Sequence, residues 1–263
     1  MYSSFQLAFK YIKYRFSASN GKGHGIHSPF VFNLVTKVLN DKTKYDAYQK
    51  IEKQRRLLLT NETIIDVDDF GAGSVKGLKK IRVVQDIAAS SLKPGKYAQL
   101  LYRLVKYLQP NEVLELGTSL GITTSYLATA QRTAQLTTLE GSATIASLAQ
   151  QTFEQLQINN INSVIGNFDD TLKTVTDKNY DFIFIDGNHR KEPTLRYFQQ
   201  LLDCIGNETV IVFDDIHWSQ EMEEAWEEIK VHPSVTLTVD LFFIGLVFFR
   251  KEQKEKEHFV IQF

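Results

Sequence analysis

The fold is decided by the segment Val113-Leu-Glu-Leu-Gly-Thr-Ser-Leu-Gly121, in which a short apolar strand runs into two glycines four residues apart. Gly117 permits a tight turn and a close backbone approach by a ligand. Gly121 lets the next helix start close to the sheet, and the N-terminus of that helix offers free N–H groups. The spacing is Glu-x-Gly-x-x-x-Gly, whereas a loop that cradles a pyrophosphate reads Gly-x-Gly-x-x-Gly. The segment therefore disfavours a nicotinamide-dependent oxidoreductase and suits a ligand with an amino acid end.

Outward from this segment, apolar strands alternate with helices. Strands are expected at 112–116, 136–139, 163–165, 180–185 and 209–213, helices at 121–130, 142–156, 193–202 and 220–230, and a closing antiparallel pair at 235–240 and 246–250. This alternation predicts an α/β fold with a parallel sheet covered by helices on both faces. Such sheets bind ligands at the carboxyl ends of their strands, so the motifs at those ends are the candidates for function.

Two strand ends carry residues suited to a nucleoside. Glu140 ends the second strand, 19 residues after Gly121, where a carboxylate accepts both hydrogen bonds of a ribose diol. The alternative is that Glu140 is a solvated acid beside Gly141 and Ser142, which is expected to cap the next helix. Asn167 and Phe168 follow the third strand and would flank a purine, or would serve only the local turn.

Two further apolar strands end in acids, Asp186 after one and Asp214 and Asp215 after the other. If these strands are neighbours, three carboxylates converge, and their repulsion raises a pKa or requires a cation. Oxygen ligands suit magnesium, manganese or calcium rather than zinc. The alternative is that Asp215 caps the next helix and Asp186 stabilises a turn.

Together these residues resemble the class I S-adenosylmethionine-dependent methyltransferases, and among them the small-molecule O-methyltransferases of the catechol O-methyltransferase-like and macrocin O-methyltransferase-like kinds. The resemblance spans about Lys96–Arg250. It implies a Rossmann-like, mostly parallel seven-stranded sheet with an antiparallel C-terminal strand. It also implies S-adenosyl-L-methionine as cofactor, a small-molecule hydroxyl as methyl acceptor, and Mg²⁺ or another divalent cation.

The resemblance assigns roles to residues at matching positions. Cofactor contacts fall on Glu115, Gly117, Thr118, Ser119, Gly121, Thr123, Glu140, Gly141, Asn167, Phe168 and Asp186, and metal ligands on Asp186, Asp214 and Asp215. Asp186 is thereby also a catalytic candidate. The chain departs from metal-dependent relatives where they have an acid proposed as base, because Asn188 stands there. We take His189 as the substitute base, with His217 and Lys191 behind it, although an isolated histidine is more often structural.

Composition bounds the remaining possibilities. The 263 residues carry a net charge of -1, and the single cysteine, Cys204, excludes a disulfide framework and a cysteine-based zinc site. The longest strongly apolar run, Leu241–Phe249, is too short for a membrane span. With no recognisable secretory signal, we expect a cytoplasmic enzyme.

Charge divides the chain unevenly. Residues 1–60 carry 11 Lys or Arg and 3 Asp or Glu, a net of +8, and residues 61–263 carry 19 and 28, a net of -9. The basic part either packs on the acidic body, which we favour, or contacts nucleic acid or an anionic membrane.

Two domains are expected, a helical N-terminal extension or cap at 1–94 and an S-adenosylmethionine-binding methyltransferase domain at 95–263. The Gly- and Asp-rich stretch 66–77, with Asp69-Phe70-Gly71, is interpreted as a flexible loop or lid and not as a kinase motif.

Two other functions stay open, a nucleic-acid methyltransferase that uses the basic region and a catalytically silent S-adenosylmethionine-binding or interaction protein. Nucleic acid is the less favoured acceptor because the fourth strand lacks the Asn/Asp-Pro-Pro-aromatic motif. The sequence does not decide the oligomeric state, and a homo-oligomer is compatible with it.

Overall fold

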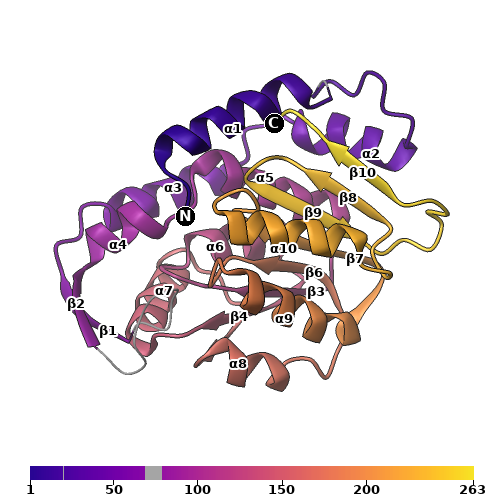
Figure 1. Ribbon diagram of the computed structural model, residues 1–263. Helices are drawn as coiled ribbons and strands as arrows, with labels where there is room; N and C mark the ends of the chain where they lie inside the picture. The colour runs from indigo at the N-terminus through magenta and orange to yellow at the C-terminus, as the bar shows by residue number, and fades with distance from the viewer. Residues whose placement is uncertain (20, 69–78) are drawn as a thin grey trace. The chain divides into compact units, whose positions relative to one another are not determined.

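The computed structural model describes residues 1–19, 21–68 and 79–263 and divides the chain into two compact units. Unit 1 combines residues 1–41 with 176–263, and unit 2 comprises residues 42–175. Figure 1 shows the elements of both units. Most of the predicted 66–77 loop, with its Asp69-Phe70-Gly71 motif, lies outside the described residues. Its first three residues, 66–68, belong to a strand rather than to a loop.

Unit 2 is built on parallel strands in the order β3-β4-β5, which are β3 (Glu112–Leu116), β4 (Gln135–Glu140) and β5 (Ile161–Ile165). The pairs Leu116–Leu139 and Glu140–Ile165 bring the carboxyl ends of the three strands to one edge. The connecting helices are α6 (Ile122–Ala130) and α7 (Ala143–Gln155), followed by α8 (Phe168–Thr171) and a 3₁₀ turn (Leu172–Thr174). Ser142 caps α7, as expected, because its hydroxyl accepts from the N–H of Ile145.

The basic segment 42–94 also belongs to unit 2. It forms α3 (Asp46–Leu58), the antiparallel hairpin β1 (Ile64–Asp68) and β2 (Lys79–Val83), and α4 (Val84–Ser91). Helix α5 (Gly95–Leu108) follows and packs on α6 through an apolar stripe of helical spacing, with Leu101, Leu104 and Val105 fully buried.

Unit 1 contains five strands in the order β10-β8-β9-β7-β6. They are β6 (Tyr180–Ile185), β7 (Ile205–Asp214), β8 (Leu237–Asp240), β9 (Ile244–Phe248) and β10 (Glu257–Val260). β6 and β7 are parallel, and β9 runs antiparallel to both of its neighbours, β7 and β8. The edge strand β10, parallel to β8, is an element that the sequence did not predict.

The helices of unit 1 come from both ends of the chain. They are α1 (Ser4–Ser17), α2 (Pro29–Leu34) continued by a π-helical turn (Val35–Leu39), α9 (Lys191–Leu201) continued by a 3₁₀ turn (Leu202–Cys204), and α10 (Gln220–Val231). Ser219 caps α10 by accepting from the N–H of Met222 at 3.2 Å. The alternative in which Asp215 caps this helix is therefore wrong.

The N-terminal residues are tied to the acidic part of unit 1. Lys10 pairs with Glu223 of α10 at 2.9 Å, and the hydroxyl of Tyr2 donates to the same carboxylate at 2.7 Å. Ser19 forms a parallel bridge with Ile261. Contacts thus group residues 1–41 with 176–263 and residues 42–94 with 95–175, and the domain boundary between residues 94 and 95 stays a prediction. None of the helices in the described part of the chain has the length and apolar character needed to cross a membrane.

Candidate cofactor and metal sites

The turn after β3 has the backbone that its glycines predict. Gly117 and Gly121 have φ values of 107° and 79°, and Ser119 between them has a φ of 49°. The N–H of Gly117 donates to the carbonyl of Leu139, which ties the turn to β4. A Cβ on Gly121 would lie 2.6 Å from the ring of Phe153 in α7. The second glycine is therefore required by a helix that packs against the turn rather than by the sheet.

Threonine hydroxyl groups near this turn donate hydrogen bonds to a buried acid, Glu115. Glu115 has no exposed surface, and its Oε2 accepts from Thr124 at 2.5 Å and from Thr138 at 2.7 Å. Thr118 shares a further hydrogen bond with Thr138 at 2.6 Å. Thr123 lies in the first turn of α6 and is 7% exposed. Glu115 thus ties the start of α6 to β4 from below the turn.

Glu140 lies beside the same turn, at the end of β4. Its Oε2 accepts from the N–H of Ser119 at 2.9 Å, and its Oε1 accepts from the N–H of Ser142 at 3.0 Å. Burial raises the pKa of Glu140, against the opposing effect of backbone N–H groups at Ser142, Ser119 and Gly141. The structure therefore brings together the Gly-x-x-x-Gly turn and the acid that the sequence placed at the next strand end.

The third strand end joins this group through the backbone. Gly166 donates its N–H to the carbonyl of Glu140 at 2.9 Å and has a φ of 142°. Asn167 then caps α8, with its Oδ1 accepting from the N–H of Asp169 at 3.1 Å. Phe168 begins that helix and is half-buried. The side-chain oxygen of Asn167 is therefore used in the local turn. The neighbouring Phe168 keeps part of its surface exposed.

Unit 1 holds the acids. Asp186, His189 and Asp214 each place one ligand atom within 4.8 Å of the others, which makes them a candidate metal group. The register Ile185–Phe213 sets Asp186 and Asp214 one residue further along two parallel neighbours. His189 Nε2 lies 3.5 Å from Asp186 Oδ1, and Asp214 is 3% exposed.

Electrostatics in this group favour a charged histidine. Burial lowers the pKa of His189, but the hydrogen bond to Asp186 and the charges of Asp186, Asp214 and Asp215 outweigh it and raise the pKa to about 9. In the described structure, His189 therefore carries a proton at neutral pH and offsets the charge of the two acids.

The third predicted metal ligand is not in the group, among the residues that the structure describes. Asp215 donates its N–H to the carbonyl of Phe243 at 2.6 Å and has a φ of 54°. Asn188 and His189 also have left-handed backbones, with φ values of 68° and 39°. Such conformations in non-glycine residues cost energy and gather at functional sites. Left-handed residues of this kind follow the carboxyl ends of both β6 and β7.

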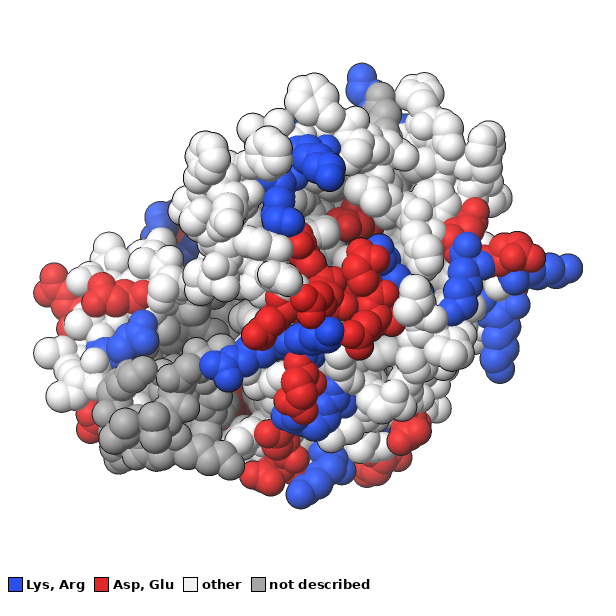
Figure 2. Space-filling view, viewed as in Figure 1, with Lys and Arg blue, Asp and Glu red and all other residues white. Residues whose placement is uncertain are grey.

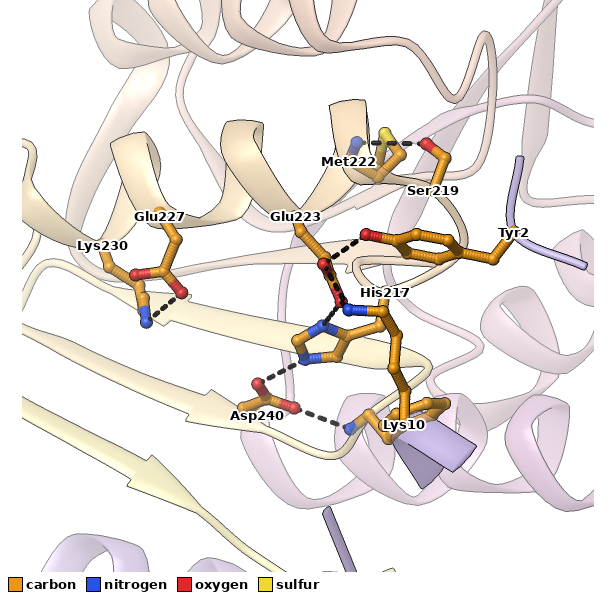
Figure 3. Close-up of polar contacts among 10 residues, drawn as sticks. Tyr2, Lys10, His217, Ser219, Met222, Glu223, Glu227, Lys230 and Asp240 are labelled. Atoms are coloured by element: carbon orange, nitrogen blue, oxygen red, sulfur yellow. Dashed lines mark hydrogen bonds and ion pairs between the residues drawn. The ribbon is translucent and has the colours of Figure 1, made fainter. Parts of the chain in front are cut away.

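Lys191 and His217, the other residues predicted as possible bases, make ion pairs elsewhere in unit 1. Lys191 pairs with Glu224 at 3.0 Å and Glu228 at 2.7 Å on α10. His217 lies between Glu223 and Asp240 (Figure 3). The structure does not bring either residue into the group of Asp186, His189 and Asp214.

Two contacts at these sites had no sequence signal. Ser91, the last residue of α4, shares a hydrogen bond with Ser119 at 2.9 Å and thereby contacts the Gly117–Gly121 turn. The amide of Asn188 donates to the Tyr197 hydroxyl of α9 at 3.2 Å, which holds the loop that carries His189. Ser91 and Tyr197 belong to none of the sequence motifs, so only the folded chain identifies them.

Residues 114–216 match a sequence family described as a methyltransferase domain. The resemblance to class I methyltransferases is confirmed. The matched segment runs from β3 to the turn after β7. It contains all the residues predicted to bind the cofactor or a metal or to act in catalysis, but the match does not assign their roles. No curated protein matches the chain.

Solved methyltransferase structures share the fold. An O-methyltransferase from Bacillus cereus in complex with SAH is 20% identical, with a TM-score of 0.56 over 81% of this chain and 95% of that one. An SAH-bound methyltransferase from Podospora anserina is 13% identical, with a TM-score of 0.61 over 95% and 98%. The O-methyltransferase TomG from Streptomyces achromogenes, in complex with SAM, is 17% identical, with a TM-score of 0.56 over 79% and 91%. These likenesses confirm the predicted Rossmann-like methyltransferase fold.

Proposed function

We propose that this chain transfers the methyl group of S-adenosyl-L-methionine to a hydroxyl group of a small molecule. The observation that carries the proposal is Glu140 hydrogen-bonded to the Gly117–Gly121 turn, within a segment that matches a methyltransferase domain. Structures of similar fold from Bacillus cereus and Streptomyces achromogenes are O-methyltransferases in complex with SAH or SAM, which supports the hydroxyl acceptor.

The residues of unit 2 fit the cofactor. Glu140 presents two acceptor oxygens at a strand end, the pattern that binds a ribose diol. Gly117 leaves the backbone approachable at the turn, and Phe168 offers a ring with exposed surface for a purine. When bound, the cofactor supplies a methyl group activated by its sulfonium. The chain's own task is to position the acceptor and to remove its proton.

The residues of unit 1 fit a divalent cation. Asp186 and Asp214 would bind the cation through oxygen, and His189 would bind it through nitrogen. Manganese, iron and zinc prefer such a mixed set of donors over a set of oxygens alone. When bound there, a divalent cation would supply Lewis-acid chemistry that lowers the pKa of an acceptor hydroxyl. His189 can serve as ligand or base only after losing its proton, since its pKa of about 9 keeps it charged at neutral pH.

Cofactor binding is tested by calorimetry and thermal unfolding with S-adenosylmethionine and S-adenosylhomocysteine. Ligand at 100 times its dissociation constant stabilises a protein by about 2.7 kcal/mol. We expect Glu140→Gln to weaken binding by about tenfold or more, because an amide loses one acceptor oxygen. The matched control is Glu154→Gln on the exposed face of α7. A folded wild-type chain that shows no binding at millimolar ligand would disprove the proposal.

The cation is tested separately with Mn²⁺, by electron paramagnetic resonance and calorimetry in the presence of S-adenosylhomocysteine. Asp186→Asn and Asp214→Asn should each lower Mn²⁺ affinity by about tenfold or more. Asp215→Asn is the control, since asparagine tolerates the left-handed backbone and Asp215 is outside the group. Equal Mn²⁺ affinity in all three variants, together with turnover that a chelator does not reduce, would remove the cation and leave the methyltransferase proposal standing.

The acceptor class is tested with a panel of hydroxylated small molecules and RNA and DNA oligonucleotides. Turnover of hydroxylated molecules supports the proposal. Turnover of oligonucleotides alone favours a nucleic-acid methyltransferase, and cofactor binding without any turnover across the panel favours a silent binding protein.

A further inference from the structure

Helix α1 has two apolar faces. The inner face carries Leu7, Tyr11 and Tyr14, which pack in one core with Ala18 and Phe242. The outer face is exposed, and its large side chains are Phe5 (82% exposed), Phe9 (65%), Ile12 (53%) and Phe16 (88%). Their spacing of three to four residues sets these four side chains in one stripe along the helix.

The helix cannot turn this stripe inward. The hydroxyl of Tyr14 donates to the carbonyl of Ile261, and Tyr11 packs edge-on against Phe242 with ring centroids 5.1 Å apart. Tyr2 and Lys10 hold the N-terminal half to Glu223 (Figure 3). Rotation would break each of these contacts and expose a second apolar face. The outer stripe therefore stays at the surface in the folded chain.

Positive charge borders the stripe. Lys13 and Arg15 are exposed on the same helix, one on each side of the apolar arc at helical spacing. Residues 1–40 carry five Lys or Arg and no Asp or Glu. In Figure 2 the surface over α1 is white with blue side chains beside it. Contiguous exposed apolar side chains of this kind mark interaction sites.

We propose that the outer face of α1 docks the protein on an anionic phospholipid surface. Phenylalanine rings with flanking cations are the composition of helices that lie in the membrane interface, where the rings enter the acyl boundary and the cations meet lipid phosphates. A second copy of this chain fits less well, because a two-fold interface along the stripe would set Lys13 and Arg15 of both copies near one another with no acid within residues 1–40. Nucleic acid would use the cations and leave the phenylalanines uncovered.

The test is vesicle co-sedimentation of the full chain. Vesicles of phosphatidylglycerol and phosphatidylcholine are compared with vesicles of phosphatidylcholine alone. Phe9→Gln/Phe16→Gln should lower binding to the anionic vesicles by about tenfold. Lys13→Gln/Arg15→Gln should lower it by about thirtyfold and should not change binding to neutral vesicles. The controls are Val231→Gln, an exposed apolar residue at the end of α10, and Lys254→Gln, an exposed cation, and neither should change binding.

Each other outcome overturns the proposal. Binding to neither vesicle, or equal binding to both, removes the anionic surface as partner. A dimer in light scattering that Phe9→Gln/Phe16→Gln dissociates assigns the face to a second copy. Duplex DNA or RNA binding that depends on Lys13 and Arg15 but not on the phenylalanines assigns the charge to nucleic acid. Circular dichroism checks that each variant stays folded, and the substituted side chains are outside the inner face that anchors the helix.

Discussion

Replacing His217 by glutamine should destabilise unit 1 in a manner that depends on pH. The ring of His217 lies 3.0 Å from Glu223 Oε1 through Nδ1 and 2.8 Å from Asp240 Oδ2 through Nε2 (Figure 3). It also stacks on Phe242. Two nitrogens that both face carboxylates can both donate only if the imidazole is protonated. Burial lowers the pKa of His217, but the hydrogen bonds and charges of Asp240 and Glu223 outweigh it, so the net pKa is raised above 6.5.

The size of the effect follows from the contacts that are lost. A hydrogen bond to a charged group contributes about 1.5–3 kcal/mol. The histidine side chain is 19% exposed, and Glu223 keeps Lys10 and Tyr2 as partners, so we expect a loss below the sum of two such bonds. Glutamine should therefore cost about 2–3 kcal/mol at about pH 6. Because the folded pKa lies above the unfolded value, this stability is fully present below about pH 6.5 and is lost as the pH rises through the folded pKa.

Urea unfolding followed by tryptophan fluorescence measures this directly. The chain has two tryptophans, Trp218 and Trp226, and both lie in unit 1 together with His217. The difference in unfolding free energy between wild type and His217→Gln should shrink from about pH 6 to about pH 9. His232→Gln is the control with the opposite trend, because burial and Lys256 lower the pKa of His232. A difference that stays constant or grows across this range would refute the charged imidazole between two acids.

Two further substitutions test the scaffold of unit 2. Gly121→Ala should destabilise the chain by about 2–3 kcal/mol and weaken S-adenosylhomocysteine binding, because the new Cβ meets Phe153 at a backbone that disfavours side chains; an unchanged urea midpoint would show that α6 and α7 separate at little cost. Tyr126→Phe should cost about 1 kcal/mol through the lost 2.8 Å hydrogen bond to Glu52, with cofactor affinity unchanged; a loss of affinity in calorimetry would contradict a purely structural role.

The sequence predicts the strand ends well and their side-chain geometry less well. Glycine spacing and apolar strands are local signals, so the turn at Gly117 and the acid at Glu140 could be placed before the fold was known. The candidate metal group could be predicted only in part. Asp186 and Asp214 meet because their strands are parallel neighbours. His189 joins them because Asn188 and His189 both have left-handed backbones, and the sequence does not predict this conformation at residues that are not glycine. Asp215 has the same kind of backbone and is not in the group.

Elements that depend on tertiary contacts were missed or misjudged. Strand β10 alternates half-buried and exposed residues and pairs with β8, so little in its own sequence identifies it. Phe5, Phe9, Ile12 and Phe16 recur at helical spacing, and α1 is a helix, as the predicted helical N-terminal extension requires. The spacing does not predict which face of α1 is buried. The buried face carries Tyr11 and Tyr14, and the phenylalanines are exposed.

Because unit 1 joins the first 41 residues to the last 88, its order of synthesis has a consequence for folding. The hydroxyl of Tyr14 binds a carbonyl 247 residues later, and Tyr2 binds an acid 221 residues later. At ribosomal speeds of about 5–20 residues per second, α1 waits for roughly 10 seconds or longer before residues 257–263 exist. The contiguous unit 2 can fold during that interval. Until Phe242 and Ile261 have been synthesised, the inner apolar face of α1 lacks the partners it has in the folded chain, and exposed apolar surface of this kind makes a nascent chain prone to aggregation.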